Sequence, residues 1–211
     1  MSEGAALLII RCAAPDVRFR AFVDKALDGA GLIGSARLHE VEALEPGTVP
    51  AHSLVLEFPS REAARDAWAT LPLSLIERPS APLALLVSKV PETGFDDPSI
   101  PTRANVTPGE DAGPMLMLIE GSASDQDVMN VYRDIILPMM FERHAYYIAF
   151  ELGGDVEVLS GTWDEAIFAI SRWPSRAAAR SFWLSDRYQN DAIPLRLDIG
   201  KFSVALMAEH Q

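Results

Sequence analysis

The chain has 211 residues, of which 49% are hydrophobic and 23% charged, and its formal net charge is −12. This composition is typical of a globular protein with a sizeable core, and the acidic balance argues against partners such as nucleic acids or anionic membrane surfaces. A single cysteine, Cys12, excludes an internal disulfide, and the absence of a signal-peptide pattern and of an apolar run near the roughly 20 residues that span a bilayer predicts a cytoplasmic protein.

Residues 1–90 are predicted to form the element order β-α-β-β-α-β. A helical stripe of apolar side chains over Phe19–Leu27 predicts the first helix, and Ser60, a favoured N-cap residue, predicts the start of the second. Short apolar runs bounded by turn residues predict the strands. These strands are expected at Leu7–Cys12, Ala36–Leu44, His52–Phe58 and Leu83–Val90.

Residues 91–114 differ from what precedes them. They hold five prolines, several acidic residues and almost no periodic apolar pattern. Such a composition is typical of a linker. We therefore divide the chain into a first half (residues 1–90), a linker (91–114) and a second half (115–211).

The second half repeats the order of elements. Ser124 and Asp127 resemble a capping box that opens a long helix, which Pro138 is expected to kink or break. Ser175 is expected to cap a second helix that runs to about residue 184. The strands are expected at Met115–Glu120, Tyr146–Leu152, Val156–Leu159, Ala166–Arg172 and Phe202–Met207.

An internal repeat links the two halves. Phe58–Trp68 returns as Trp173–Trp183, with seven of the eleven positions identical. A repeat of this kind indicates two copies of one unit. We therefore predict an α+β protein in which two tandem ferredoxin-like (β-α-β-β-α-β) halves pack their sheets together as an intrachain pseudo-dimeric α/β barrel.

The repeat also places an arginine just after each cap serine. Arg61 and Arg176 lie where the helix dipole disfavours a positive charge. The repetition of this unfavourable placement suggests a partner for each arginine, an acidic residue across the interface between the halves. A solvated surface arginine is the alternative.

Several residues of the second half together resemble the DUF1330 family of the dimeric α/β-barrel superfamily, over residues 115–208. The matching positions are Tyr132, Pro138, His144, Leu159–Trp163, Trp173–Ser175, Ala178, Tyr188–Gln189 and Arg196. The chain departs from the family pattern at Ala145 and Tyr146, where glycines are usual, and at Arg172, where a carboxylate is usual. The first half keeps Phe58–Ser60 but has no counterpart of Tyr188–Gln189, so it resembles a degenerate copy. The resemblance implies the fold and no particular reaction.

Two features of the sequence could indicate a cofactor or a metal, but neither has the arrangement that such a site needs. Gly29–Gly34 has the glycine spacing of a dinucleotide loop, but a helix is expected before it and a strand after it, the reverse of what such a site needs. The four histidines show no spacing typical of metal ligands. We therefore expect no cofactor and no metal.

The residues singled out for function lie in the second half. Tyr132, Trp163 and Tyr188 are candidates for the wall of an apolar ligand pocket, with core and interface packing as the alternative. His144, at the end of the long helix, is a candidate catalytic acid or base, with capping of the helix as the alternative. The predicted ligand-binding set is thus Tyr132, His144, Trp163 and Tyr188.

Three functions remain open at this stage. The first, which we favour, is the binding of a small organic molecule in the second half. The second is a cofactor-free enzyme, such as a monooxygenase or an isomerase, because the superfamily resemblance implies such activities on this fold. The third is a non-catalytic protein-interaction module, which a barrel interior packed solid with side chains would favour. Both a monomer and a homodimer are compatible with the sequence.

Overall fold

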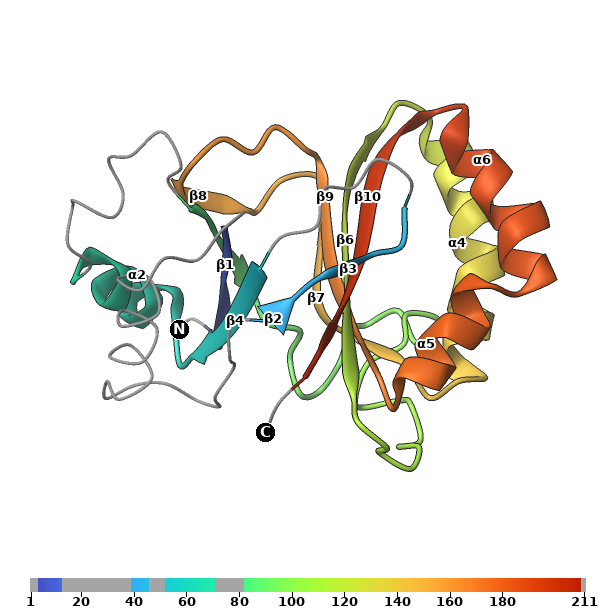
Figure 1. The fold of residues 1–211 in the computed structure, drawn as a ribbon, viewed down its shortest axis with the longest axis horizontal. Helices are drawn as coiled ribbons and strands as arrows, with labels where there is room; N and C mark the ends of the chain where they lie inside the picture. Colours follow the sequence, from blue (N-terminus) through green and yellow to red (C-terminus); the bar gives the residue numbers. More distant parts are fainter. Residues whose placement is uncertain (1–3, 13–38, 46–51, 71–81, 210–211) are drawn as a thin grey trace.

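The computed structural model describes residues 4–12, 39–45, 52–70 and 82–209. Figure 1 shows two sheets side by side, with helices on the outer flank of each. The helix expected at Phe19–Leu27 and the glycine-rich turn at Gly29–Gly34 lie outside the described residues. No helix within the described ranges is long and apolar enough to cross a membrane.

Sheet A is antiparallel and has the strand order β2-β4-β1-β5-β8. In that order its strands are His39–Glu40, His52–Phe58, Ala6–Cys12, Leu83–Ser88 and Glu157–Ser160. The central strand β1 pairs with β4 and β5, so that Leu8 lies opposite both Leu56 and Leu86. Helix α2 (Arg61–Ala69) covers the outer face through the buried side chains of Ala64 and Trp68.

Sheet B is also antiparallel and has the strand order β3-β10-β6-β9-β7. In that order its strands are Glu42–Ala43, Gly200–Ala208, Met115–Ala123, Ile167–Trp173 and Tyr146–Leu152. Its helices are α4 (Gln126–Phe141), α5 (Arg176–Trp183), the π-helix η1 (Arg187–Ala192) and α6 (Ile193–Leu197). These helices lie on the side of sheet B that faces away from sheet A (Figure 1). The predicted α+β class is confirmed.

Each sheet takes one edge strand from the other half of the chain. Strand β3 of the first half pairs with β10, where Ala43 lies opposite Ala205. Strand β8 of the second half pairs with β5, where Val158 lies opposite Leu85. The two halves are therefore interlocked at one edge of each sheet.

Among the residues that the structure describes, the core consists of three apolar clusters, one on each helical flank and one between the sheets. Alternation along β6 illustrates how the layers form, because neighbouring side chains of a strand point to opposite faces. Leu116 and Leu118 join the cluster between the sheets, whereas Met115 and Met117 join the cluster under the helices. The middle cluster also contains Leu7 and Ile9 of β1, so the two sheets pack face to face.

Residues 91–114, which we call the strap, form no helix or strand but are packed against the second half. Phe95 and Ile100 contact the cluster under the helices of sheet B. The Tyr147 N–H donates to the carbonyl of Pro101 at 2.9 Å. The Asn105 amide donates to the Ile100 carbonyl at 2.9 Å and thereby holds the strap's own turn. The strap is thus an ordered part of the second half's surface.

The predicted caps of the two repeated helices are confirmed, but the cap of the long helix is not. Ser60 accepts a hydrogen bond from the Ala63 N–H, and Ser175 accepts one from the Ala178 N–H, both at 3.1 Å. The N-cap of α4 is Asp125 rather than Ser124, because the Asp125 carboxylate accepts from two backbone N–H groups of the first turn.

Two details concern the start and the end of α4. The Ser124 hydroxyl is occupied elsewhere, since it donates to the Ile199 carbonyl at 2.9 Å. Pro138 does not break α4, which continues to Phe141. The proline lacks the N–H that would bond the carbonyl four residues earlier, so α4 continues past it without that one hydrogen bond.

The repeated arginines meet acidic partners in the opposite half, as predicted. Arg61 of α2 forms an ion pair with Asp155, which precedes β8, at 3.2 Å. Arg176 of α5 forms an ion pair with Glu42 of β3. In each case a helix of one half holds the segment that the other half contributes to its sheet. The second arginine of each repeat does the same, in the pairs Arg65–Glu157 and Arg180–Glu42.

Candidate functional site

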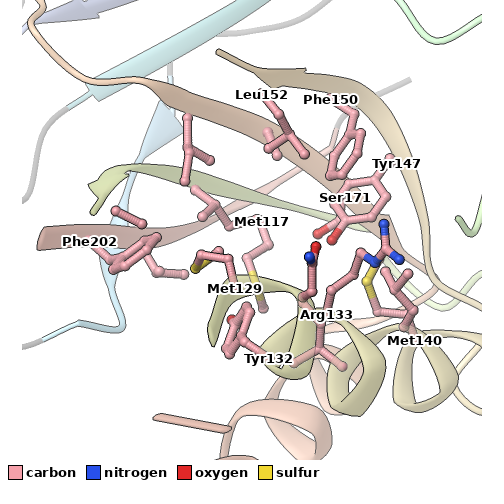
Figure 2. A pocket seen from close by; sticks show the side chains of 18 of the residues that line it. Met117, Met129, Tyr132, Arg133, Met140, Tyr147, Phe150, Leu152, Ser171 and Phe202 are labelled. Atoms are coloured by element: carbon pink, nitrogen blue, oxygen red, sulfur yellow. The ribbon is translucent and has the colours of Figure 1, made fainter. Parts of the chain in front are cut away.

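A cavity of about 270 Å³ lies between α4 and the outer face of sheet B (Figure 2). Its wall is mostly apolar, and strands and helices contribute to it together. Met117 and Ala169 line it from the sheet, Met129 and Met140 line it from α4, and Phe202 closes one side. These positions follow from strand and helix periodicity, which point alternate strand residues and one helix stripe into the same layer.

A β-bulge in β7 shapes the wall of the cavity. Tyr147 lies opposite Ser171, but Ala149 lies opposite Ile170, so Ile148 is an extra residue in this strand. A bulge shifts the alternation of side chains by one position. Tyr147 and Phe150 consequently face the same side, with ring centroids 4.5 Å apart, and both line the cavity.

Two tyrosine hydroxyls meet at the helical side of the cavity. Tyr132 of α4 and Tyr188 of η1 both line it, and their hydroxyl oxygens are 3.2 Å apart. Burial raises the pKa of Tyr132, and it raises the pKa of Tyr188 well above its ordinary value. Both phenols therefore stay protonated at neutral pH and act as hydrogen-bonding groups rather than as bases.

A buried arginine lies near the tyrosine pair. The Arg196 side chain is 1% exposed and forms an ion pair with Glu45, which belongs to the first half. Its guanidinium lies 5.0 Å from the ring centroid of Phe202 and 5.7 Å from that of Trp183. The backbone N–H of Glu45 donates to the Val204 carbonyl of β10 at 3.2 Å. Glu45 of the first half thus contributes to the core beside the cavity.

At another side of the cavity three hydrogen-bond donors converge. Figure 2 shows Arg133 of α4 extending towards Tyr147 and Ser171 of the sheet. Tyr147 is 5% exposed, and burial raises the pKa of its phenol. The Arg133 Nε atom is buried and has no hydrogen-bond partner among the described residues. This donor-rich side is one polar part of a mostly apolar space.

His144 lies in a second cavity, about 380 Å³ in volume, beneath the strap. Its backbone has a φ of 57°, in the left-handed region that few non-glycine residues adopt. Its Nδ1 atom is 2.9 Å from the Thr107 carbonyl oxygen, and a Cβ added at Gly109 would come within 3.1 Å of the imidazole ring. His144 therefore fastens the strap to the end of α4. Several charged side chains surround this cavity in ion pairs, among them Lys89–Glu57, Arg172–Asp111 and Arg172–Glu209.

Trp163 lies between the sheets, outside both cavities. Its indole N–H donates to Glu120 at 3.1 Å, and its ring meets Phe168 edge to face with centroids 6.3 Å apart. Glu120 also forms an ion pair with Arg11 of the first half. Trp163 thus packs against the cluster that joins the two sheets.

The structure therefore brings together two of the four predicted ligand-binding residues. Tyr132 and Tyr188 line one cavity, His144 lines the other, and Trp163 lines neither. Sequence reasoning missed Tyr147, Ser171 and Arg133. The bulge at Ile148 interrupts the strand alternation that would relate Tyr147 to Phe150, and no motif in the sequence marks Ser171 or Arg133.

Within the described ranges, no group of three or more histidine, cysteine, aspartate or glutamate side chains could hold a metal ion. The carboxylate that lines the cavity in this part of the chain is Asp125, which is occupied in capping α4. The chemistry available to a bound molecule therefore consists of apolar contact, hydroxyl and amide hydrogen bonds, and the charge of Arg133.

Comparison with solved structures finds similar chains at low sequence identity. A mutant chlorite dismutase from Candidatus Nitrospira defluvii in complex with cyanide is 10% identical, with a TM-score of 0.50 over 100% of this chain and 92% of that one. An anthrone oxidase-like protein is 12% identical, with a TM-score of 0.48 over 99% and 92% of the two chains. A dye-decolorizing protein from V. cholerae is 9% identical, with a TM-score of 0.45 over 98% and 94%. At 10% identity, the likeness to the chlorite dismutase concerns the fold alone.

The family comparison adds a more particular result. Residues 115–209 match the family described as "Domain of unknown function (DUF1330)". The resemblance predicted from the second half is thereby confirmed for that half. No curated protein matches the chain. Three residues that carried the resemblance, Tyr132, Tyr188 and Arg196, form one cluster beside the cavity, as described above.

Proposed function

We propose that the protein binds a small, largely apolar organic molecule in the cavity between α4 and sheet B. The observation that carries this proposal is the combination of an open space of about 270 Å³ with a mostly apolar wall and a few convergent polar groups. Small-molecule sites usually have this composition. A solidly packed interior would favour an interaction module. Tyr132 and Tyr188 instead line an open cavity.

The size of the cavity limits the ligand. An apolar cavity of about 150 Å³ is large enough to hold benzene. A space of about 270 Å³ therefore suits a body of one or two rings, or a branched chain of similar volume. Met117, Met129 and Met140 give the wall flexible and polarizable contacts, which can adapt to such a body.

The polar groups of the cavity favour binding over catalysis. A general base must be able to accept a proton near neutral pH. The phenols of Tyr132, Tyr147 and Tyr188 all have raised pKa values, and Asp125 is held by backbone N–H groups. His144, the predicted acid or base, lies in the other cavity. We therefore favour ligand binding over the alternative function, that of a cofactor-free monooxygenase or isomerase.

We also infer that the two halves stand for the two subunits of a dimeric α/β barrel. The repeated helix starts, the edge strands that each half lends to the other, and the paired arginine contacts support this inference. Residues 1–90 would form the degenerate half, residues 91–114 the strap and residues 115–211 the ligand-binding half. A single chain would then supply what two chains supply elsewhere on this fold.

The binding proposal can be tested with a variant that fills the cavity. Ala169 is 3% exposed and lines the cavity, so Ala169→Leu would occupy the ligand's space. Ala177 lies on the exposed face of α5, so Ala177→Leu adds the same atoms elsewhere. Thermal-shift and calorimetric titrations with indole, 2-naphthol and 1-tetralone should show binding to the wild type and to Ala177→Leu and none to Ala169→Leu. Absence of binding to the wild type, or equal binding to both variants, would contradict the proposal.

A further inference from the structure

We propose that the ligand carries a carboxylate, which binds where Tyr147, Ser171 and Arg133 converge, while its apolar body fills the rest of the cavity. This inference rests on the proposed binding function and gives the ligand a chemical class. None of these three residues was among the predicted site residues.

The Tyr147 hydroxyl supplies the first hydrogen-bond donor. Tyr147 is 5% exposed, its side chain lines the cavity, and no described residue hydrogen-bonds to its hydroxyl. The side chain lines an open space, so the hydroxyl proton is available to whatever fills the cavity. Because burial raises the pKa of Tyr147, the phenol keeps its proton at neutral pH. It is therefore a donor that faces the cavity without an acceptor.

Ser171 supplies a second donor beside the first. It lies directly opposite Tyr147 on the neighbouring strand and is 1% exposed. Its oxygen accepts a hydrogen bond from the indole N–H of Trp173 at 2.9 Å. A hydroxyl that accepts in this way still has its own proton to donate. The indole thus fixes the oxygen and leaves the proton for a ligand.

Arg133 supplies the charge. Its Nε atom is buried and unpartnered, although the side chain as a whole is 40% exposed. Two carboxylates lie near it. An oxygen of Asp134 is 3.9 Å from Nε itself, beyond hydrogen-bond distance, and Asp97 belongs to the strap; both carboxylates are exposed to solvent. Pairs exposed in this way contribute little. Because Nε makes no hydrogen bond to a described residue, the guanidinium remains able to bind an acceptor inside the cavity.

Together these groups select a carboxylate over a neutral carbonyl. A carboxylate can accept about four hydrogen bonds and bears the charge that complements a guanidinium. A ketone oxygen has two lone pairs and no charge, so it would satisfy fewer of the three donors. The remaining wall is mostly apolar, with side chains such as Met117, Leu152 and Phe202, and suits a hydrocarbon body. It also includes the amides of Gln126 and Asn130 and the Asp125 carboxylate, which is occupied in capping α4.

The test uses two ligands of the same shape. 2-Naphthoate and 2-acetylnaphthalene share one body and differ in that a carboxylate oxygen replaces a methyl group. Calorimetry should show 2-naphthoate binding the wild type about tenfold or more tightly than the ketone, the effect expected for hydrogen bonds to a charged group. Arg133→Met and Tyr147→Phe should each weaken naphthoate binding by about tenfold and change ketone binding by less than about threefold.

Two controls separate loss of the carboxylate contact from damage to the cavity: a matched arginine variant and the ketone itself. Arg187 is a half-exposed arginine that pairs with Glu142 and does not line the cavity, so Arg187→Met should leave both affinities unchanged. Unaltered ketone binding by a variant shows that its cavity is intact. Equal affinity for acid and ketone, unaffected by Arg133→Met, would overturn the carboxylate assignment and leave the binding function standing. Failure of both compounds to bind the wild type would overturn the two proposals together.

Discussion

At the scale of single residues, the second half contains buried tyrosines in two contrasting states. Tyr188 is 2% exposed and shares a hydrogen bond with Tyr132, whereas Tyr147 is 5% exposed and has no partner for its hydroxyl among the described residues. Losing a hydroxyl that satisfies another buried group is costly, but losing an unpaired one is not. The same substitution should therefore have opposite consequences at the two sites.

We predict that Tyr188→Phe lowers the free energy of unfolding by about 1–3 kcal/mol, because the buried Tyr132 hydroxyl then lacks a partner. Tyr147→Phe should change it by less than about 0.5 kcal/mol or raise it, since no hydrogen bond is lost. Urea denaturation of the two variants measures both values. The double variant Tyr132→Phe/Tyr188→Phe, which removes both hydroxyls, should recover most of the loss. Equal losses for Tyr147→Phe and Tyr188→Phe would contradict this account.

These residues also show how far the sequence could predict the site. Tyr132 and Tyr188 were predictable, because family resemblance and aromatic character both pointed to them. Tyr147 and Phe150 were not, because their common orientation depends on the bulge at Ile148, and nothing in the composition of the strand marks an extra residue. His144 lies after the end of the long helix, as predicted. Its backbone is left-handed, and its imidazole contacts the strap instead of the cavity between α4 and sheet B.

At the scale of elements, the repeated helices α2 and α5 begin in the same way. Ser60 and Ser175 have extended backbones with φ of −157° and −161°, and each hydroxyl accepts from the backbone N–H three residues later. A hydroxyl in this position satisfies one of the N–H groups that the first turn leaves without an intrahelical partner. The repeated Pro-Ser-Arg sequence therefore serves the helix start as well as the contact between the halves.

Replacing either serine by alanine should lower the free energy of unfolding by about 0.5–2 kcal/mol, because one N–H of the first turn is left without an acceptor. Denaturation midpoints of Ser60→Ala and Ser175→Ala measure the loss. Aspartate is an equally favoured N-cap residue, so Ser60→Asp and Ser175→Asp should retain most of the stability. If alanine and aspartate behaved alike, the hydroxyl would not be acting as a cap.

Elements without a strong periodic pattern were harder to predict. The composition of residues 91–114 indicated a linker, and the strap indeed has no helix or strand. Its packing depends on isolated apolar side chains, such as Phe95 and Ile100, and on the turn held by Asn105. Contacts of this kind have no period, so a sequence pattern cannot reveal them. The shift of the α4 cap from Ser124 to Asp125 has a similar origin, since both residue types cap helices well and the Ile199 carbonyl takes the serine hydroxyl.

At the scale of the whole molecule, the halves are joined by two kinds of ion pair. The exposed kind includes the contacts of Arg176 and Arg180 with Glu42, and the repeat predicted an acidic partner across the halves for Arg176 but not for Arg180. The buried kind was not predicted, because Glu45 and Arg196 show no pattern that relates them across the chain. Both glutamates come from the same short segment of the first half, and they differ mainly in burial. This difference allows the two kinds of contact to be compared directly.

We expect Glu45→Ala to lower the free energy of unfolding by about 3–5 kcal/mol, because it leaves the charge of Arg196 buried without its partner. Glu42→Ala should lower it by at most about 1 kcal/mol, since its arginine partners are half-exposed and solvent screens the pairs. Urea denaturation at low and high salt separates the two, because added salt should abolish the effect of Glu42→Ala and spare that of Glu45→Ala.

A compensating change distinguishes loss of the pair from loss of packing at position 45. Replacing both members by apolar residues of similar length, as in Glu45→Met/Arg196→Met, removes the buried charge together with its partner, so the double variant should be markedly more stable than Glu45→Ala. If Glu45→Ala and Glu42→Ala were equally mild, Arg196 would find another partner or solvent in the variant. The segment after β3 would then join the halves mainly through the backbone hydrogen bonds that Leu44 and Glu45 donate to Val204.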